Sequence, residues 1–109
     1  MTTKRVVEYL DRNGSSPFRK WFEQLDSTAA AKIATALYRL EQGNMSNVKS
    51  VRKGVSEYRI DFGPGYRLYF GQQGQTVIVL LGGGTKKRQR KDIASAQMLW
   101  AEYKSRKRG

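Results

Sequence analysis

The segment from Glu57 to Phe70 constrains the fold most, because its pattern is typical of a β-hairpin. Two runs rich in β-branched and aromatic residues flank Gly63-Pro64-Gly65, a tripeptide of turn-forming residues. With this tripeptide as the loop, Asp61 lies opposite Arg67 and Arg59 lies opposite Tyr69. One face of the hairpin is then continuously apolar, and it consists of Tyr58, Ile60, Phe62, Tyr66, Leu68 and Phe70.

The rest of the chain predicts an N-terminal strand and a helical hairpin. Residues 4–10 are rich in strand-forming types, and Ser16-Pro17 is typical of a helix start. The apolar residues that follow share one helical face: Phe18, Trp21, Phe22 and Leu25. Asp26-Ser27 then predicts a break and a second cap, with a helix over about 28–42 that ends at Gly43.

The C-terminal half predicts a sheet followed by one helix. A polar connector over 43–54 leads to strands at about 55–62, 66–73 and 76–82, and a helix covers about 90–104. Strand 76–82 is apolar on both faces, so we expect it to be central or covered by a helix. The expected fold is a single α+β domain over residues 1–109, of order βααβββα with an antiparallel-rich sheet and a basic tail at 104–109.

Composition limits the location and the chemistry. The chain has no long apolar run and no signal-peptide pattern, so we expect no membrane association. It has no cysteine, which suits the cytoplasm and excludes disulfides and thiolate metal sites. It has no histidine either, and its acids are scattered, so we expect no metal and no cofactor. Any acid–base chemistry would use Lys, Arg, Tyr, Asp or Glu.

The net charge of +12 favours an anionic partner. Nucleic acid, the ribosome and an acidic protein all fit such a charge. The alternative is that the charge only keeps the protein soluble. Arg59 and Arg67 are the first candidates for contact with phosphate, since a guanidinium stays charged and can donate two parallel hydrogen bonds to phosphate oxygens. The alternative is an ordinary ion pair with a neighbouring acid, above all Asp61 with Arg67.

A second cluster of candidates follows the last strand. Gly82-Gly83-Gly84 allows close approach of the backbone to a phosphate, although the spacing is not that of a nucleotide-binding loop. Five cations then occur within six residues: Lys86, Lys87, Arg88, Arg90 and Lys91. Lys49, Arg52 and Lys53 form a looser basic cluster. Tyr66 and Tyr69 flank Arg67 and could stack on a base. Tyr69, beside Arg59, is the better candidate of the two, because Tyr66 shares the apolar face of the hairpin.

The hairpin, the apolar strand and the Gly-Gly-Gly-Thr-Lys-Lys exit resemble the RelE/ParE superfamily of toxins from type II toxin–antitoxin modules. The likeness is greatest to the phage-derived, HigB-like branch called addiction module killer proteins, and Gly65-Tyr66-Arg67 is its most specific element. The resemblance implies a ribosome-dependent, metal-independent mRNA endonuclease. It also implies a cognate antitoxin of helix-turn-helix type, through which the complex binds operator DNA.

The resemblance also implies roles for individual residues. Arg67 matches the strand arginine, Arg59 takes the position of a catalytic lysine, and Lys86 or Lys87 takes that of the basic residue after the last strand. RNA contacts are expected from Lys49, Lys53, Tyr69, Arg88, Arg90 and Lys91.

Two departures from the superfamily pattern leave other functions open. Asp61 replaces a cation, and Ile93 lies near the place of the C-terminal tyrosine. The general base is therefore unassigned. A ParE-like gyrase poison, a non-catalytic nucleic-acid-binding module and a harmless antitoxin partner remain alternatives.

Overall fold

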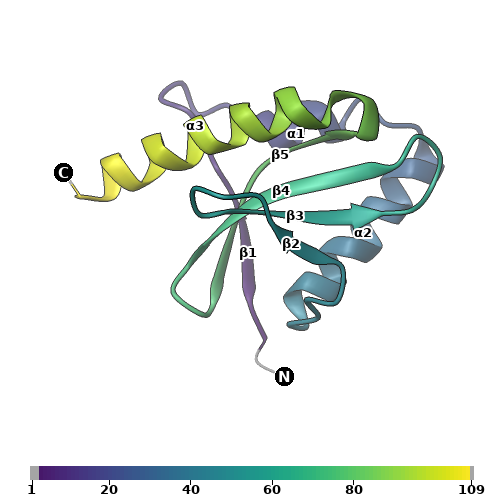
Figure 1. The fold of residues 1–109 in the computed structure, drawn as a ribbon, viewed down its shortest axis with the longest axis horizontal. Helices are drawn as coiled ribbons and strands as arrows, with labels where there is room; N and C mark the ends of the chain where they lie inside the picture. The colour runs from purple at the N-terminus through teal and green to yellow at the C-terminus, as the bar shows by residue number, and fades with distance from the viewer. Residues whose placement is uncertain (1–2, 109) are drawn as a thin grey trace.

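The computed structural model describes residues 3–108, which form a small α+β domain. A five-stranded sheet of order β1-β5-β4-β3-β2 lies between helices, with β1 parallel to β5 and the other neighbours antiparallel. Helices α1 and α2 cover one face and α3 crosses the other (Figure 1). The elements are β1 (Arg5–Glu8), α1 (Pro17–Phe22), α2 (Ser27–Glu41), β2 (Val48–Ser50), β3 (Val55–Ile60), β4 (Tyr66–Gln73), β5 (Val77–Thr85), the 3₁₀ helix η1 (Lys86–Arg88) and α3 (Gln89–Arg108). None of these helices is long and apolar enough to span a membrane.

Both helices begin where the sequence predicts, but α1 ends at Phe22, so Leu25 lies outside it. Ser16 caps α1, because its Oγ accepts the backbone amide of Arg19 at 3.0 Å, and Pro17 takes the first helical position. Asp26 caps α2 in the same way through the amide of Ala29 at 2.8 Å. Gly43 then ends the helix region with a φ of 81°, a conformation that glycine adopts without strain.

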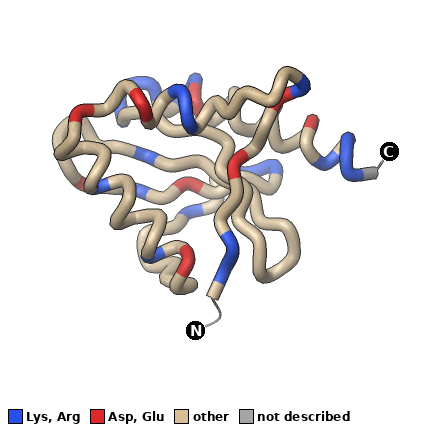
Figure 2. The backbone as a smooth tube through the Cα atoms, turned by 180° about the vertical axis from the view of Figure 1, so that it is seen from behind, with Lys and Arg blue, Asp and Glu red and all other residues tan. Residues whose placement is uncertain are grey.

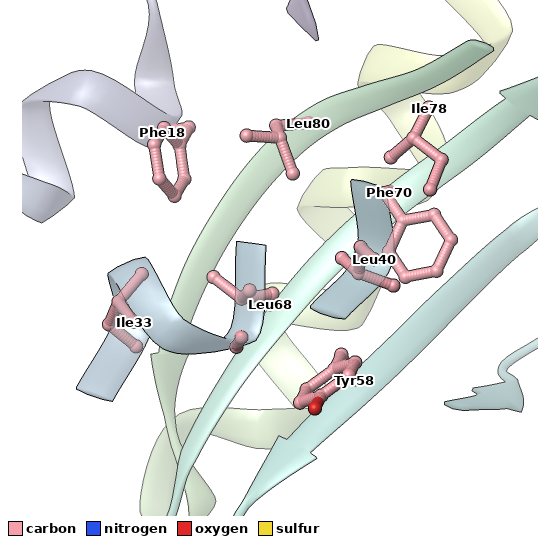
Figure 3. Close-up of a cluster of buried hydrophobic side chains, with 9 residues drawn as sticks. Phe18, Ile33, Leu40, Tyr58, Leu68, Phe70, Ile78 and Leu80 are labelled. Carbon is pink, nitrogen blue, oxygen red and sulfur yellow. The ribbon is translucent and has the colours of Figure 1, made fainter. Parts of the chain in front are cut away.

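The core has two layers, one on each side of the sheet. On the α2 side, Ile33 and Leu40 pack against Leu68 and Phe70 of β4 (Figure 3). On the α3 side, Ala96 and Trp100 form the second layer together with Tyr9, Val55, Tyr69, Val79 and Leu81. Strand β5 lies between β1 and β4 and supplies buried residues to both layers, which confirms that helices cover it as predicted.

The register of the β3–β4 hairpin differs from the expected one. Ile60 pairs with Tyr66 and Arg59 with Arg67, so the turn comprises all of 61–65 and not only the Gly-Pro-Gly tripeptide. Hydrogen bonds from Gly65 N to Phe62 O (3.0 Å) and from Phe62 N to Ile60 O (2.9 Å) close this longer turn. The pairing is displaced by two residues, an even number, so every strand residue keeps its predicted face.

Two further elements depart from the sequence prediction. The connector over 43–54 contains β2, a short edge strand paired with β3. The residues expected to form a basic tail instead continue α3 as far as Arg108. An ion pair between Arg106 and Glu102 (2.7 Å) lies within the helix, and a bond from Arg106 to the carbonyl of Leu10 (2.7 Å) holds this last part against the domain. Gly109 lies outside the described residues.

The three consecutive glycines of β5 differ in their surroundings. A Cβ at Gly83 would collide with the ring of Trp21, and one at Gly84 would collide with the carboxylate of Asp92. A Cβ at Gly82 would meet no atom within 4 Å. At least two of the glycines therefore make room for side chains of α1 and α3, which is a different use from the phosphate approach considered above.

We expect Gly83→Ala to lower the free energy of unfolding by about 1–3 kcal/mol, because the added methyl group overpacks the contact with Trp21. Gly82→Ala is the matched control and should change it by less than about 0.5 kcal/mol. Urea unfolding of both variants measures the difference. Equal losses in the two variants would show that the close approach of Trp21 does not decide the residue at position 83.

Candidate nucleic-acid interface

The basic segment Lys86–Lys91 follows the end of β5 and comprises η1 and the first residues of α3. All five of its cations are exposed: Lys86, Lys87, Arg88, Arg90 and Lys91. The N-terminus of a helix carries a partial positive charge, so cations there disfavour the helix by roughly 0.3–1 kcal/mol each. Lys and Arg are also frequent over the rest of the backbone, whereas Asp and Glu are few (Figure 2). The exposed cations and the positive end of the helix therefore both favour an anionic partner at this place.

The hairpin turn lies directly against this segment. The backbone amide of Lys86 donates to the carbonyl of Gly65 at 2.8 Å, and Arg67 Nη1 donates to the same oxygen at 2.7 Å. Arg67 is paired with Arg59 on one side and with Gly84 on the other. The fold therefore brings Arg59, Arg67 and Lys86 to one end of the sheet, which we call the hairpin end.

The two arginines of the hairpin end have different environments. Arg59 is exposed, whereas Arg67 is only 4% exposed and lies beside Glu57, which is 1% exposed. Arg67 Nε is 3.8 Å from Glu57 Oε2, an ion pair without a hydrogen bond. The same carboxylate oxygen accepts a bond of 2.8 Å from Gln89 Nε2. The expected partner of Arg67, Asp61, lies instead in the exposed turn, because the register is displaced by two residues.

Tyr69 does not fit its predicted role in base stacking. Its ring belongs to the second core layer and the residue is 1% exposed, so it offers no free face to a base. Burial, followed by the nearby charges of Glu57 and Asp92, raises the pKa of its hydroxyl. The prediction is wrong because α3 covers this face of the sheet.

Asp92 of α3 is a candidate functional residue that the sequence pattern did not single out. It is half-buried, and burial raises its pKa against the opposing effect of Arg88 and Lys91. Within residues 3–108, Asp92 Oδ2 and Tyr69 Oη are among the buried polar atoms without a hydrogen-bond partner. Both residues line a hollow of about 130 Å³ between α3 and β5.

The looser basic cluster divides into two places. Lys49 and Arg59 line a hollow of about 530 Å³ together with two cations of α2, Lys32 and Arg39, which the sequence did not single out. Lys53 lies in the turn between β2 and β3, where the neighbouring Gly54 approaches the ring of Trp100. That ring is eleven residues along α3 from Gln89, or about 16 Å. Lys53 is thus remote from the hairpin end.

The described part of the chain offers no group of acidic side chains close enough together to hold a metal ion. What it does offer at the hairpin end is an array of exposed cations on a rigid strand and a helix start. Such an array can bind phosphate groups and can offset charge that develops on them.

Comparisons with known proteins agree with this class of small α+β domain. The fold is similar to that of the free E. coli toxin RelE in a doubly substituted mutant, with a TM-score of 0.64 and 14% sequence identity over 89% of this chain and 96% of that one. Residues 20–101 match the family model described as phage derived protein Gp49-like (DUF891), and the chain belongs to that family. An uncharacterized protein of Haemophilus influenzae is 43% identical over 86 residues, which cover 78% of this chain and 87% of the relative.

We expect Asp92→Asn to stabilise the protein in a pH-dependent way. A carboxyl group with a raised pKa keeps its proton in the folded state over a pH range in which the unfolded chain has lost it. Stability therefore falls as the pH rises from the ordinary value of 3.8 through the raised pKa of Asp92. The variant lacks this loss, so its advantage over the unaltered protein should grow through that window.

Asp11→Asn is the control of opposite sign, measured by urea unfolding over the same pH series. Backbone hydrogen bonds, first from Ser15, lower the pKa of Asp11 from its ordinary value of 3.8. Stability from Asp11 is therefore present above 3.8 and is lost as the pH falls through the lowered pKa. A pH-independent difference for Asp92→Asn, or one of the same sign as for Asp11→Asn, would contradict the burial effect at Asp92.

Proposed function

We propose that this protein is a RelE-type toxin that cuts mRNA bound to the ribosome, without a metal ion. The observation that carries the proposal is that Arg59 of β3 and Lys86 and Lys87 after β5 are placed at the same end of a RelE-like sheet. The Gly-Tyr-Arg element and membership of the phage-derived family support it.

The proposed reaction needs positive charge of the kind that the hairpin end offers. The 2′-hydroxyl gives up its proton to water or to an unassigned base, and its oxygen attacks the adjacent phosphorus. The new P–O bond closes a 2′,3′-cyclic phosphate, the bond to the 5′-oxygen breaks, and the 5′-oxygen takes up a proton from water. Negative charge accumulates on the phosphoryl oxygens as the phosphorus becomes pentacoordinate. Lys86 and Lys87 would offset that charge and Arg59 would orient the phosphate, since preorganised cations stabilise a transition state without reorganisation at the moment of reaction.

The same proposal includes partners and a place in the cell. A cytoplasmic toxin of the HigB-like branch would be held inactive by a cognate antitoxin of helix-turn-helix type. The toxin–antitoxin complex would then bind operator DNA through the antitoxin. An acidic antitoxin surface would complement the net charge of +12.

A ParE-like gyrase poison is the second candidate, and one residue favours it. Ile93, near the position of the tyrosine that assists cleavage in RelE-type toxins, packs against the second core layer. Isoleucine has no hydroxyl group, so this residue cannot take the role of that tyrosine. The two candidates predict different molecular damage on induction.

We expect induction of the chain without its antitoxin to arrest growth and to create new mRNA 5′ ends within codons. Arg59→Gln and Lys86→Gln should each lower the rate of cleavage by on the order of 10²-fold, because each removes a preorganised cation. Mapping of mRNA 5′ ends after induction measures this directly.

The control removes two exposed charges elsewhere, in the variant Arg12→Gln/Lys20→Gln, and should leave cleavage unchanged. Intact mRNA with gyrase-linked DNA breaks would favour the second candidate. RNA that is bound in a salt-dependent way but never cut would point to a non-catalytic module. Equal losses in both sets of variants would refute the assignment of the hairpin end.

A further inference from the structure

A closed series of contacts joins five residues at the hairpin end, and we call it the Glu57–Gln89 ring. Glu57 of β3 lies beside Arg67 of β4 (Nε to Oε2, 3.8 Å), and Arg67 donates to the carbonyl of Gly65 (2.7 Å). That carbonyl also accepts the amide of Lys86 (2.8 Å). Gln89, three residues after Lys86, donates to Glu57 (2.8 Å) and closes the ring. The ring ties both hairpin strands and their turn to the start of the basic segment.

Arg67 lies inside this ring and not on its outer surface. Its side chain is 5% exposed and that of Glu57 is 1% exposed. A phosphate could reach the guanidinium only by entering this buried space and competing with the carboxylate. Arg59, its direct neighbour across the strands, is exposed and needs no such rearrangement. The two arginines are therefore suited to different tasks.

The ring fixes the backbone of the hairpin end without adding net charge through its buried ion pair. Arg59, Lys86 and Lys87 repel one another, and long side chains on a loose segment would move apart. The buried carboxylate of Glu57 is paired with Arg67, so the ring does not add to this repulsion. The two bonds to the Gly65 carbonyl fix the backbone from which Lys86 projects.

We propose that Glu57, Arg67 and Gln89 are positioning residues that hold Lys86 and Lys87 beside Arg59. Arg67 then acts on RNA through the ring and does not touch the phosphate. The assignment rests on the proposed function for its role in cleavage. The placement of the basic segment by the ring is a property of the protein alone and can be tested without RNA cleavage.

Gln89→Leu is the sharpest variant, because it breaks the ring without removing a charge or unpairing the buried ions. Gln97→Leu is its matched control. Gln97 lies on the same helix, is also half-buried and donates to the carbonyl of Val51 at 2.9 Å. Amide hydrogen exchange should become at least about tenfold faster over residues 86–91 in Gln89→Leu only. Equal protection of that segment in the two variants would overturn the ring's positioning role.

Binding of RNA tests the consequence for phosphate contacts. The probe is single-stranded 2′-O-methyl RNA, which cannot be cut by attack of a 2′-hydroxyl. Each lost phosphate contact on a single strand lowers the salt dependence of binding by about 0.7 in log–log slope. Gln89→Leu should therefore lower the slope although it removes no charge, and Gln97→Leu should leave it unchanged. An unchanged slope in both variants would contradict the proposal.

Glu57→Gln separates positioning from direct contact, because the two roles predict opposite signs. If Arg67 positions the basic segment, the variant should lower the salt slope and slow mRNA cleavage about tenfold, with little further loss on adding Gln89→Leu. If Arg67 binds phosphate directly, release from the carboxylate should raise both affinity and slope. Glu23→Gln, at an exposed acid, controls for the change in net charge.

The outcomes separate this inference from the proposed function. Should the unaltered protein leave mRNA intact, the toxin assignment fails, while the exchange and salt-slope comparisons still test the ring. Should the protein cut mRNA but Glu57→Gln bind the probe more tightly than Glu23→Gln does, the ring assignment fails and Arg67 becomes a direct contact. Cleavage together with a steeper salt slope in Glu57→Gln would overturn the ring assignment in the same way.

Discussion

The burial of β5 on both faces is the constraint on which the rest of the structure depends. Ile78 and Leu80 face the layer built on α2, while Val79 and Leu81 face the layer under α3. The strand can be covered on both sides only if helices approach it closely, and Gly83 and Gly84 allow that approach beyond the apolar stretch. The chain then has to leave the sheet at Thr85, so the basic segment that follows is delivered to a fixed place.

The same constraint explains why the hairpin end carries the exposed charge. Both faces of the sheet are used for the core, so the polar groups of β3 and β4 gather where coverage ends. Glu57 and Arg67 lie just inside that limit and are buried, and Arg59 lies just outside it. One strand pair therefore contains both a buried ion pair and an exposed cation on the same face.

Much of the fold followed from local sequence signals, whereas much of the site did not. The caps at Ser16 and Asp26 and the two-sided apolar pattern of 76–82 are local, and the structure confirms them. Strand alternation assigned each residue of the hairpin to the correct face, but it could not tell that α3 covers the face of Tyr69. The partner of Arg67 depends on register, which turned on the length of one loop.

A buried ion pair in so basic a protein is better explained by placement than by stability. Removing two charges from water costs about as much as their attraction returns, so the pair of Glu57 and Arg67 adds little net free energy. Its imperfect distance of 3.8 Å and the unpartnered Nε of Arg67 make a large gain still less plausible. The pair instead fixes two contacts to the basic segment. Arg67 binds the Gly65 carbonyl, which accepts the amide of Lys86, and Glu57 accepts a bond from Gln89. Cations that repel one another need such a fixed support if they are to converge on a single phosphate.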